Sequence, residues 1–328
     1  MKRRKAISIK SWLLCLFSLL SVLFFAAGCG KQEESAQTKT APPAYAYSVT
    51  DSQGYELRLE KKPQRIVSLS ISTDEIWLDL VDAERIVALT YLADDAGISN
   101  VTEKAKKVKG RVQRSNAEAL VAMQPDLIVI PDFTSKDDVD LLRTMKLNVY
   151  VYKTPTNIEE IKRSVQNIGA AVGENERAQA VAQAMEARLE LVKAKLAKLP
   201  LEKEKSVVFM QSNGAYYRRD MTFNDICRNA RVKNALDGLN YDGEFLASQE
   251  EIVSLNPDVF VLAGWNYNGA YDAAKNEEAL LADTAYSGVT AVKNKAVYTL
   301  PAAHLLSTSQ YIVDAVADMA RAVYGAEV

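Results

Sequence analysis

Aromatic and polar side chains follow the ends of several predicted strands in this 328-residue sequence. Aromatic rings offer apolar faces, and hydroxyl, indole and guanidinium groups offer hydrogen bonds. This mixture suits a large, flat or greasy ligand with polar edges. The candidate ligand-binding residues are Ser72, Thr73, Tyr91, Tyr216, Tyr217, Arg218, Trp265, Tyr267 and His304, and Ser70, Phe133 and Lys153 lie in the same loops.

His304 is the only histidine, and this limits the chemistry. A Ser-His-Asp hydrolase would need His304 as its base, and no Gly-x-Ser-x-Gly turn follows a predicted strand. A zinc site would draw on several Cys and His ligands. Gly-rich loops that cradle phosphate are also absent from the sequence. We therefore expect no catalytic residues, no metal site of the protein's own and no cofactor.

Strand-like and helix-like segments alternate along the chain, which indicates an α/β fold with mainly parallel sheets. A helical pattern over 74–81 follows the first predicted strand. The predicted strands are Arg65–Leu69, Ile86–Leu89, Leu127–Ile130 and Val149–Tyr152 in a first series, and Ser206–Met210, Val259–Leu262 and Ala296–Leu300 in a second series.

The two series repeat one another. Residues 115–129 and 247–261 each predict a short helix, a Pro-Asp turn and a buried strand, and in both a glutamate lies seven residues before the proline. These glutamates are Glu118 and Glu250. Asn116 and Ser248 suit helix N-caps, and the helix dipole alone could explain a glutamate in the first turn that follows. Repetition of the whole unit nevertheless predicts two similar lobes.

A long amphipathic helix is predicted between the lobes, from Glu174 to Leu199. Its apolar residues recur at helical spacing without an internal Gly or Pro, and Pro200 ends the pattern. Such a helix predicts a stiff spine between the lobes rather than a loose hinge.

The first thirty residues have the order of a secretory signal. Basic residues at 2–5 precede a charge-free apolar run over 12–27, and Cys29 follows Ala26-Ala27-Gly28. This pattern resembles the lipobox of bacterial lipoproteins, in which the cysteine thiol is acylated. An uncleaved membrane anchor is the alternative, although the run is slightly short for one. The polar stretch over 30–44 predicts a flexible tether.

Removal of residues 1–28 leaves 35 basic and 42 acidic residues, a formal net charge of −7. An acidic chain without a basic cluster is a poor candidate for binding nucleic acid. Cys227 would be the one cysteine of the folded part, so a disulfide framework is excluded, and we expect this side chain to pack in a core.

From Pro63 to the C-terminus the chain resembles the class III substrate-binding proteins of ABC importers, which carry iron–siderophore complexes, haem or cobalamin. The resemblance rests on the Pro63–Leu69 segment, both Glu-x6-Pro-Asp units and the interlobe helix. It implies a ligand cleft between the lobes, at the carboxyl ends of the strands. It also implies that Glu118 and Glu250 dock with arginines of the permease.

The resemblance predicts this division of the chain: 1–28 signal peptide, 29–62 lipidated cysteine, tether and lead-in, 63–173 N-terminal lobe, 174–200 interlobe helix and 201–328 C-terminal lobe. We expect a monomeric extracytoplasmic protein, anchored by lipid to the cell membrane at the cell surface or in the periplasm. Its partners would be the transmembrane subunits of an ABC permease and a small-molecule ligand, with no nucleic acid.

The ligand stays open between an iron–siderophore complex, cobalamin and haem. Arg218 could pair with a carboxylate or propionate of such a ligand. His304 could ligate haem iron or corrinoid cobalt, or only line the cleft, and a tyrosine phenolate from Tyr91, Tyr216 or Tyr217 could also bind haem. A cell-surface enzyme and an adhesion module are the alternatives from other classes.

Overall fold

The computed structural model describes residues 47–113, 116–199, 204–211, 214–239, 241, 243–266 and 271–325. They belong to one compact unit, Tyr45–Val328, separate from Met1–Ala44. The predicted signal peptide, the lipidated Cys29 and the 30–44 tether lie outside the described residues, and so does Tyr267. Within the described ranges, no helix combines the length and apolarity that crossing a bilayer requires.

The first lobe is built on a parallel five-stranded sheet of order β5-β4-β3-β6-β7. Its strands are β3 (Ile66–Ser68), β4 (Ile86–Thr90), β5 (Gly110–Val112), β6 (Leu127–Pro131) and β7 (Val149–Tyr152). Alternate residues of β6 enter two different cores, with Leu127 and Val129 on one face and Ile128 and Ile130 on the other. Strands that are apolar on both sides are typical of parallel sheets covered by helices.

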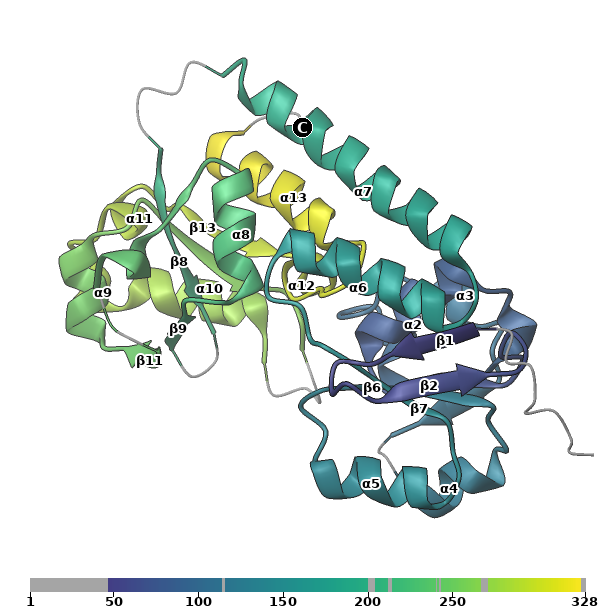
Figure 1. The fold of residues 1–328 in the computed structure, drawn as a ribbon. Helices are drawn as coiled ribbons and strands as arrows, with labels where there is room; N and C mark the ends of the chain where they lie inside the picture. The colour runs from purple at the N-terminus through teal and green to yellow at the C-terminus, as the bar shows by residue number, and fades with distance from the viewer. Residues whose placement is uncertain are drawn as a thin grey trace, which may run out of the picture. The chain divides into compact units, whose positions relative to one another are not determined.

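Helices cover both faces of this sheet (Figure 1). On one face lie α2 (Ile71–Leu80), α3 (Thr102–Ala105) and α6 (Ile158–Ala171), and on the other lie α4 (Ala117–Ala122) and α5 (Lys136–Thr144). Two 3-10 turns, η1 (Ala83–Arg85) and η2 (Tyr91–Asp94), flank β4. An antiparallel hairpin of β1 (Tyr47–Thr50) and β2 (Glu56–Leu59), which the sequence pattern did not predict, precedes the sheet.

The second lobe has a parallel sheet of order β10-β8-β12-β13 and an antiparallel ribbon of β11 and β9. One face packs against α8 (Thr222–Asn229) and α13 (Ile312–Tyr324), and the other against α9 (Gln249–Leu255), α10 (Ala273–Ala282) and α11 (Thr290–Lys293). The remaining elements are β8 (Ser206–Met210), β9 (Ala215–Arg218), β10 (Lys233–Asn234), β11 (Glu244–Ala247), β12 (Val259–Ala263), β13 (Val297–Leu300), α12 (Ala302–Leu305), η3 (Ala235–Leu239) and η5 (Thr284–Tyr286).

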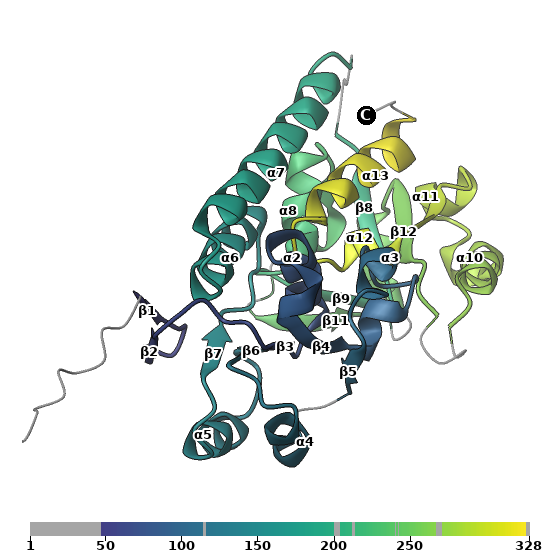
Figure 2. The same cartoon turned by 90° about the vertical axis from the view of Figure 1, so that its right-hand side faces the viewer.

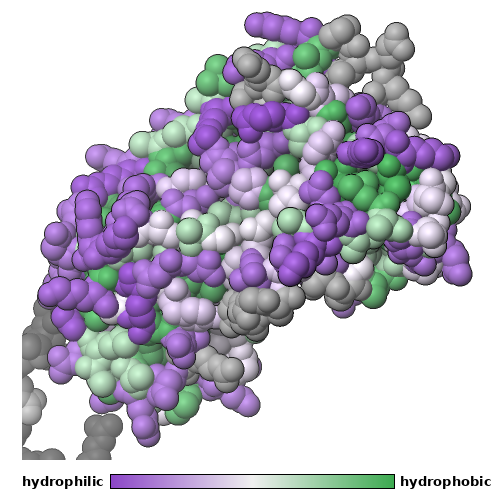
Figure 3. Space-filling model, turned by 180° about the vertical axis from the view of Figure 1, so that it is seen from behind, coloured by the Kyte–Doolittle hydropathy of each residue, from purple (hydrophilic) through white to green (hydrophobic). Residues whose placement is uncertain are grey.

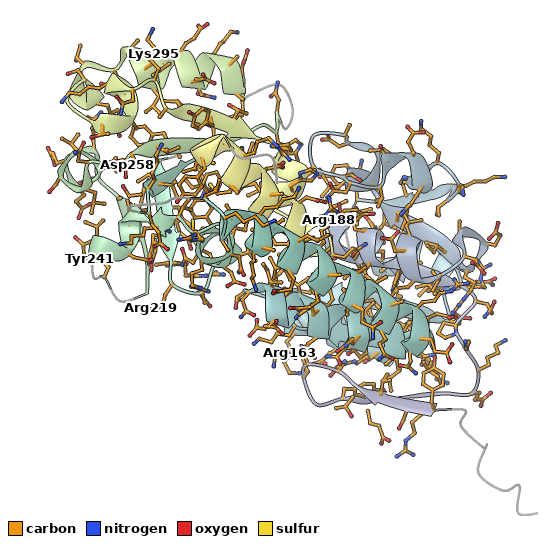
Figure 4. All side chains as sticks on the ribbon, turned by 90° about the horizontal axis from the view of Figure 1, so that it is seen from above. Arg163, Arg188, Arg219, Tyr241, Asp258 and Lys295 are labelled. Atoms are coloured by element: carbon orange, nitrogen blue, oxygen red, sulfur yellow. The ribbon has the colours of Figure 1, made fainter. Side chains whose placement is uncertain are left out.

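The predicted spine is α7 (Asn175–Leu196), a 22-residue helix. At a rise of 1.5 Å per residue it is about 33 Å long. Its buried side chains belong to a core that contains residues of both lobes. Figures 1 and 2 show α7 running alongside α6 and α13. Arg188 of α7, labelled in Figure 4, forms an ion pair with Asp314 of α13. The helix therefore ties the lobes together through side-chain packing.

The two repeated units have the same local structure. Asn116 and Ser248 cap α4 and α9 through their side chains, as predicted. The residue before each proline, Gln124 or Asn256, has a positive φ of 49° or 47°. The aspartate after the proline then accepts a backbone hydrogen bond from the start of the neighbouring strand segment: Asp126 from Arg65, and Asp258 from Ser206. The α/β fold with two similar lobes is confirmed.

Cys227 belongs to α8, is 1% exposed and points into the core. Burial raises the pKa of its thiol well above the ordinary value. This is the packing role that the sequence predicted for it.

Figure 3 shows hydrophilic side chains over most of the back of the molecule and hydrophobic ones gathered on the second lobe. Among the described large hydrophobic side chains, Phe133 is the most exposed, at 77%. It belongs to the loop after β6, one of the strand ends considered next.

Candidate functional site

A cavity of about 360 Å³ opens at the carboxyl ends of β3, β4, β5 and β6 in the first lobe. Its apolar lining includes Leu69, Ile130 and Phe133, and its polar lining includes Gln113 and Asp138. The strand ends of a parallel sheet are the usual place for a ligand, because the side chains of successive loops converge there.

The second lobe has its own cavity of about 280 Å³, at the ends of β8 and β12. Met210 and Leu262 form an apolar wall, whereas Gln211, Gln249 and Tyr271 supply polar groups. The buried hydroxyl of Tyr271 has no hydrogen-bond partner among the described residues. Each lobe thus presents a mixed polar and apolar cavity at its strand ends.

Ser72 and Thr73 lie in the first turn of α2 and are 6% and 0% exposed. Thr73 is hydrogen-bonded to Ser68 and to the N-cap residue Ser70. Ser72 instead contacts Thr308 of the second lobe through its hydroxyl. These side chains therefore hold the start of α2 and join the lobes.

A buried carboxylate, Glu75, continues this interlobe contact. Its side chain is 2% exposed and accepts hydrogen bonds from Asn100 and from Ser309. Asn100 also donates to the carbonyl of Ala303, and Gln310 donates to the carbonyl of Glu75. We call Glu75, Asn100, Ser307, Ser309 and Gln310 the pivot cluster. Burial raises the pKa of Glu75, although the hydrogen bonds it accepts oppose that shift.

Asp74, the residue before Glu75, is fully buried and accepts hydrogen bonds from the backbone and side chain of Thr90. Burial raises its pKa to about 7, and hydrogen bonds from Ser68 and Thr90 oppose the shift. Thr90 ends β4, so this carboxyl supports the floor of the first-lobe cavity from below.

Trp265 follows β12 and reaches across to the first lobe. Its indole N–H donates to Asp95 Oδ2 at 2.9 Å. The ring also lies against Gly97, where an added Cβ would come 2.5 Å from Trp265 Cδ1. We call Trp265 and Asp95 the rim pair, because both follow strand ends and are partly exposed. Trp265 therefore contacts the opposite lobe.

Tyr216, Tyr217 and Arg218 lie in β9, where alternate side chains face opposite ways. Tyr217 is 5% exposed, belongs to the second-lobe core and donates to Asp237 Oδ1 at 2.5 Å. Burial and this hydrogen bond raise the pKa of Tyr217 to about 12. Tyr216 donates to Glu244 and Arg218 forms an ion pair with Asp220.

His304 lies on α12, and its Nδ1 is 2.6 Å from Asp318 Oδ2 of α13. This hydrogen bond raises the pKa of His304, against the effect of burial. Burial alone would raise the pKa of Asp318, but His304 and Arg321 together lower it. The imidazole of His304 therefore links α12 to α13.

The other predicted cleft residues have mixed placements. Tyr91, in η2 directly after β4, is 36% exposed. Lys153 follows β7 and lies 3.3 Å from the Glu160 carboxylate. Within the described ranges, no group of three or more His, Cys, Asp or Glu side chains is arranged to hold a metal ion.

Glu118 and Glu250 are exposed on the first turns of α4 and α9. Figure 1 shows these helices on different lobes, both on the side away from α7. Across the described part of the chain, neither carboxylate makes a hydrogen bond or ion pair.

The profile of the periplasmic binding protein family matches residues 66–304. The chain belongs to this family. The match includes both cavities, the spine helix and both glutamates, so the whole two-lobed site is part of the family's fold.

Curated relatives of this periplasmic binding protein include a transporter lipoprotein and a cobalamin-binding protein. An uncharacterized ABC transporter substrate-binding lipoprotein, YvrC of Bacillus subtilis strain 168, is 24% identical over 315 residues, which cover 94% of this chain and 95% of that protein. A cobalamin-binding protein of Halobacterium salinarum is 24% identical over 162 residues, covering 49% of this chain and 43% of the relative. The family of this chain and the name of its Bacillus relative agree, since both describe proteins that bind a substrate outside the cytoplasm or for a transporter.

Solved structures confirm the fold. A periplasmic binding protein from Veillonella parvula has a TM-score of 0.72 and 20% identity, and the match covers 86% of this chain and 98% of that one. The haem-binding protein RhuT from Roseiflexus has a TM-score of 0.68 and 17% identity, with coverage of 80% and 98%.

Sequence reasoning missed the residues that join the lobes of this periplasmic binding protein. Glu75, Asp95 and the segment over 307–311 are not among the site residues that the sequence predicts. The sequence features that mark these two acids are weak. Glu75 falls on the apolar side of α2, beside Ile76, and Asp95 lies two residues before a glycine.

Proposed function

We propose that this chain captures an iron–siderophore or cobalamin-type ligand between its lobes and delivers it to an ABC permease. The observation that carries the proposal is the pair of mixed polar and apolar cavities at the strand ends of both lobes. A ligand that enters both cavities at once would be large, with apolar surface and several hydrogen-bonding groups at its edges.

Haem is the less favoured ligand. Haem iron is held by an axial side chain such as His or Tyr. His304 is paired with Asp318, Tyr217 is buried in a core, and Tyr216 donates to Glu244. The name of the Halobacterium relative also supports a corrinoid.

The ligand is tested with the soluble domain that starts after Cys29. Cyanocobalamin, a ferric hydroxamate siderophore and haem are added in turn, and the absorbance spectrum and native mass are recorded. We expect a one-to-one complex with cyanocobalamin or the siderophore. A complex with haem alone would reverse the order of ligands, and binding of none of the three would reject this ligand class.

We further propose that Glu118 and Glu250 dock with arginines of the permease. Two unpaired carboxylates on separate lobes suit recognition by a two-fold partner, because carboxylate–arginine pairs are directional. Cells carrying the Glu118→Lys and Glu250→Lys double substitution should lose uptake, while the purified domain keeps its ligand affinity.

A matched control uses two exposed glutamates near the spine. Glu159→Lys with Glu190→Lys makes the same change in net charge on α6 and α7, and these side chains are 69% and 59% exposed. This control should keep uptake. Loss of uptake in both double variants, or loss of ligand affinity in the docking variant, would contradict the docking role.

The lipid anchor at Cys29, the monomeric state and the division into 1–28, 29–62, 63–173, 174–200 and 201–328 belong to the same proposal. The relative from Bacillus subtilis, a lipoprotein by name, supports the anchor. The Cys29→Ala chain should leave the membrane fraction, and retention of that variant in the membrane would favour an uncleaved anchor.

A further inference from the structure

Two of the contacts that join the lobes differ in kind. Apart from Asn100, the residues of the pivot cluster are buried, and its hydrogen bonds join α2 and Asn100 to the segment over 303–310. The rim pair joins two strand-end loops that are partly exposed. If the lobes move relative to one another, the rim pair should therefore change more than the pivot cluster, because fewer and more exposed groups hold it.

Asp95 is prepared for this contact by its own loop. Its Oδ1 accepts a hydrogen bond from the Gly97 backbone at 2.8 Å, while its Oδ2 accepts from the Trp265 indole. Its carbonyl accepts from Ile98 and Ser99. The acceptor is therefore held in place before Trp265 arrives, which reduces the entropy lost when the contact forms.

Gly97 is required by the approach of the indole. A Cβ at this position would lie 2.5 Å from Trp265 Cδ1, 3.4 Å from its Nε1 and 3.1 Å from Asp95 Oδ1. Trp265 cannot keep this position against any other residue without moving. The glycine thus offers a test that leaves both polar partners intact.

We propose that the rim pair is a ligand-retention latch. It closes one side of the cleft when the lobes close over the ligand, and it must open before the ligand leaves. Asp95 and Gly97 act as positioning residues, since they hold Trp265 and do not contact the ligand. This inference rests on the proposed function for its ligand, but the latch itself is a contact between lobes that can be measured in the free protein.

The first experiment measures the latch without ligand. The soluble domain after Cys29 has two tryptophans, Trp77 and Trp265, and Trp77 is fully buried. In a Trp77→Phe background, Trp265 becomes the sole indole fluorophore. Gly97→Ala and Asp95→Leu should each shift its emission to the red and increase its quenching by acrylamide, whereas Asp95→Asn, which keeps an acceptor oxygen, should behave as the parent.

The second experiment measures the dissociation rate of whichever probe binds the parent domain, cyanocobalamin or the ferric hydroxamate siderophore. The net free energy of one intramolecular hydrogen bond is enough to change a rate by about tenfold. Trp265→Phe, which lacks the N–H, and Gly97→Ala should therefore release the probe about tenfold faster. Association rates should change much less, and Trp265→Phe combined with Asp95→Leu should add nothing to the larger single effect.

The outcomes separate the two proposals. If neither probe binds the parent domain, the proposed ligand class fails, and the quenching experiment still decides whether the contact exists. Equal quenching in the parent, Gly97→Ala and Asp95→Leu would overturn the latch. Equal dissociation rates in the parent and Trp265→Phe would overturn its role in retention even where ligand binding is confirmed.

Discussion

The pivot cluster and the rim pair both connect the lobes, yet their surroundings give them opposite properties. Glu75, Ser307, Ser309 and Gln310 are each at most 7% exposed, so a polar group that lost its partner there could not turn to water. The rim pair is partly exposed, and its groups can exchange partners with solvent. Burial therefore raises the free energy needed to break the pivot cluster, whereas the partly exposed rim pair can break and form again.

The largest effect is expected from removal of the central carboxylate of the pivot cluster. Glu75→Ala would remove the acceptor of the Asn100 backbone N–H and one partner of the buried Ser309 hydroxyl, and the free energy of unfolding should fall by about 3 kcal/mol. Urea denaturation of the soluble domain measures this change. Glu103, an 81% exposed glutamate on α3, gives the control: Glu103→Ala should stay within about 0.5 kcal/mol. Equal losses of stability in Glu75→Ala and Glu103→Ala would contradict the claim that burial makes the Glu75 contact the stronger one.

A second effect concerns pH and the neighbouring Asp74. Its pKa is raised to about 7, above the unfolded value of about 3.9. The folded state therefore binds the proton more tightly. The resulting stabilisation is complete below about pH 4 and is lost as the pH rises through about 7.

Stability measured from pH 5 to pH 8 should consequently fall more steeply for the parent domain than for Asp74→Asn, whose amide does not titrate. The pKa of Glu75 is raised as well, so Glu75→Gln should flatten the curve in the same direction. Parallel curves for the parent and both variants would show that these carboxyls keep ordinary pKa values in the folded state.

A smaller effect is expected at His304, on the helix that leads into the pivot segment. The pKa of His304 is raised by Asp318, so its stabilisation is present below the unfolded pKa of about 6.5 and is lost as the pH rises through the folded value. His304→Gln should lower stability at pH 5.5 by about 0.5–1 kcal/mol and have little effect at pH 9. The titration of His304 by NMR, with Asp318→Asn for comparison, checks the assignment; an unchanged His304 pKa in that variant would contradict it.

The smallest change in stability is expected at the rim. Asp95→Asn should alter the free energy of unfolding by no more than about 0.5 kcal/mol, because the residue is partly exposed and an acceptor oxygen remains. A loss as large as that of Glu75→Ala would mean that the rim pair is a second structural joint between the lobes.

Local pattern was sufficient to predict much of the fold. Apolar runs gave β6, β7 and β8 nearly to the residue, and the helical spacing of residues such as Met185 and Leu189 gave α7. Capping chemistry at Asn116 and Ser248 gave α4 and α9. These signals are short-range, so they can be read without knowing what the segment packs against.

The site was harder to predict because its contacts join distant segments. Glu75 and Ser309 are 234 residues apart, and Asp95 and Trp265 are 170 apart, so no local pattern marks either pair. In β9 the strand was not recognised. Because successive side chains of a strand face opposite sides, Tyr217 enters the core and Tyr216 does not, but without the strand the two residues could not be told apart. His304 was predicted to line the cleft because it follows a strand, and no local pattern marked its partner Asp318 on α13.

The burial of Cys227 has a practical meaning for the study of lobe motion. Its thiol is 1% exposed and its pKa is raised well above normal, so it should be inert to maleimides at neutral pH. A soluble domain that starts after Cys29 is therefore a background in which two cysteines, introduced one on each lobe, can carry a fluorescent donor and acceptor without removal of any native residue. Because the thiol of Cys227 is buried, only the two introduced cysteines would be labelled in single-molecule distance measurements.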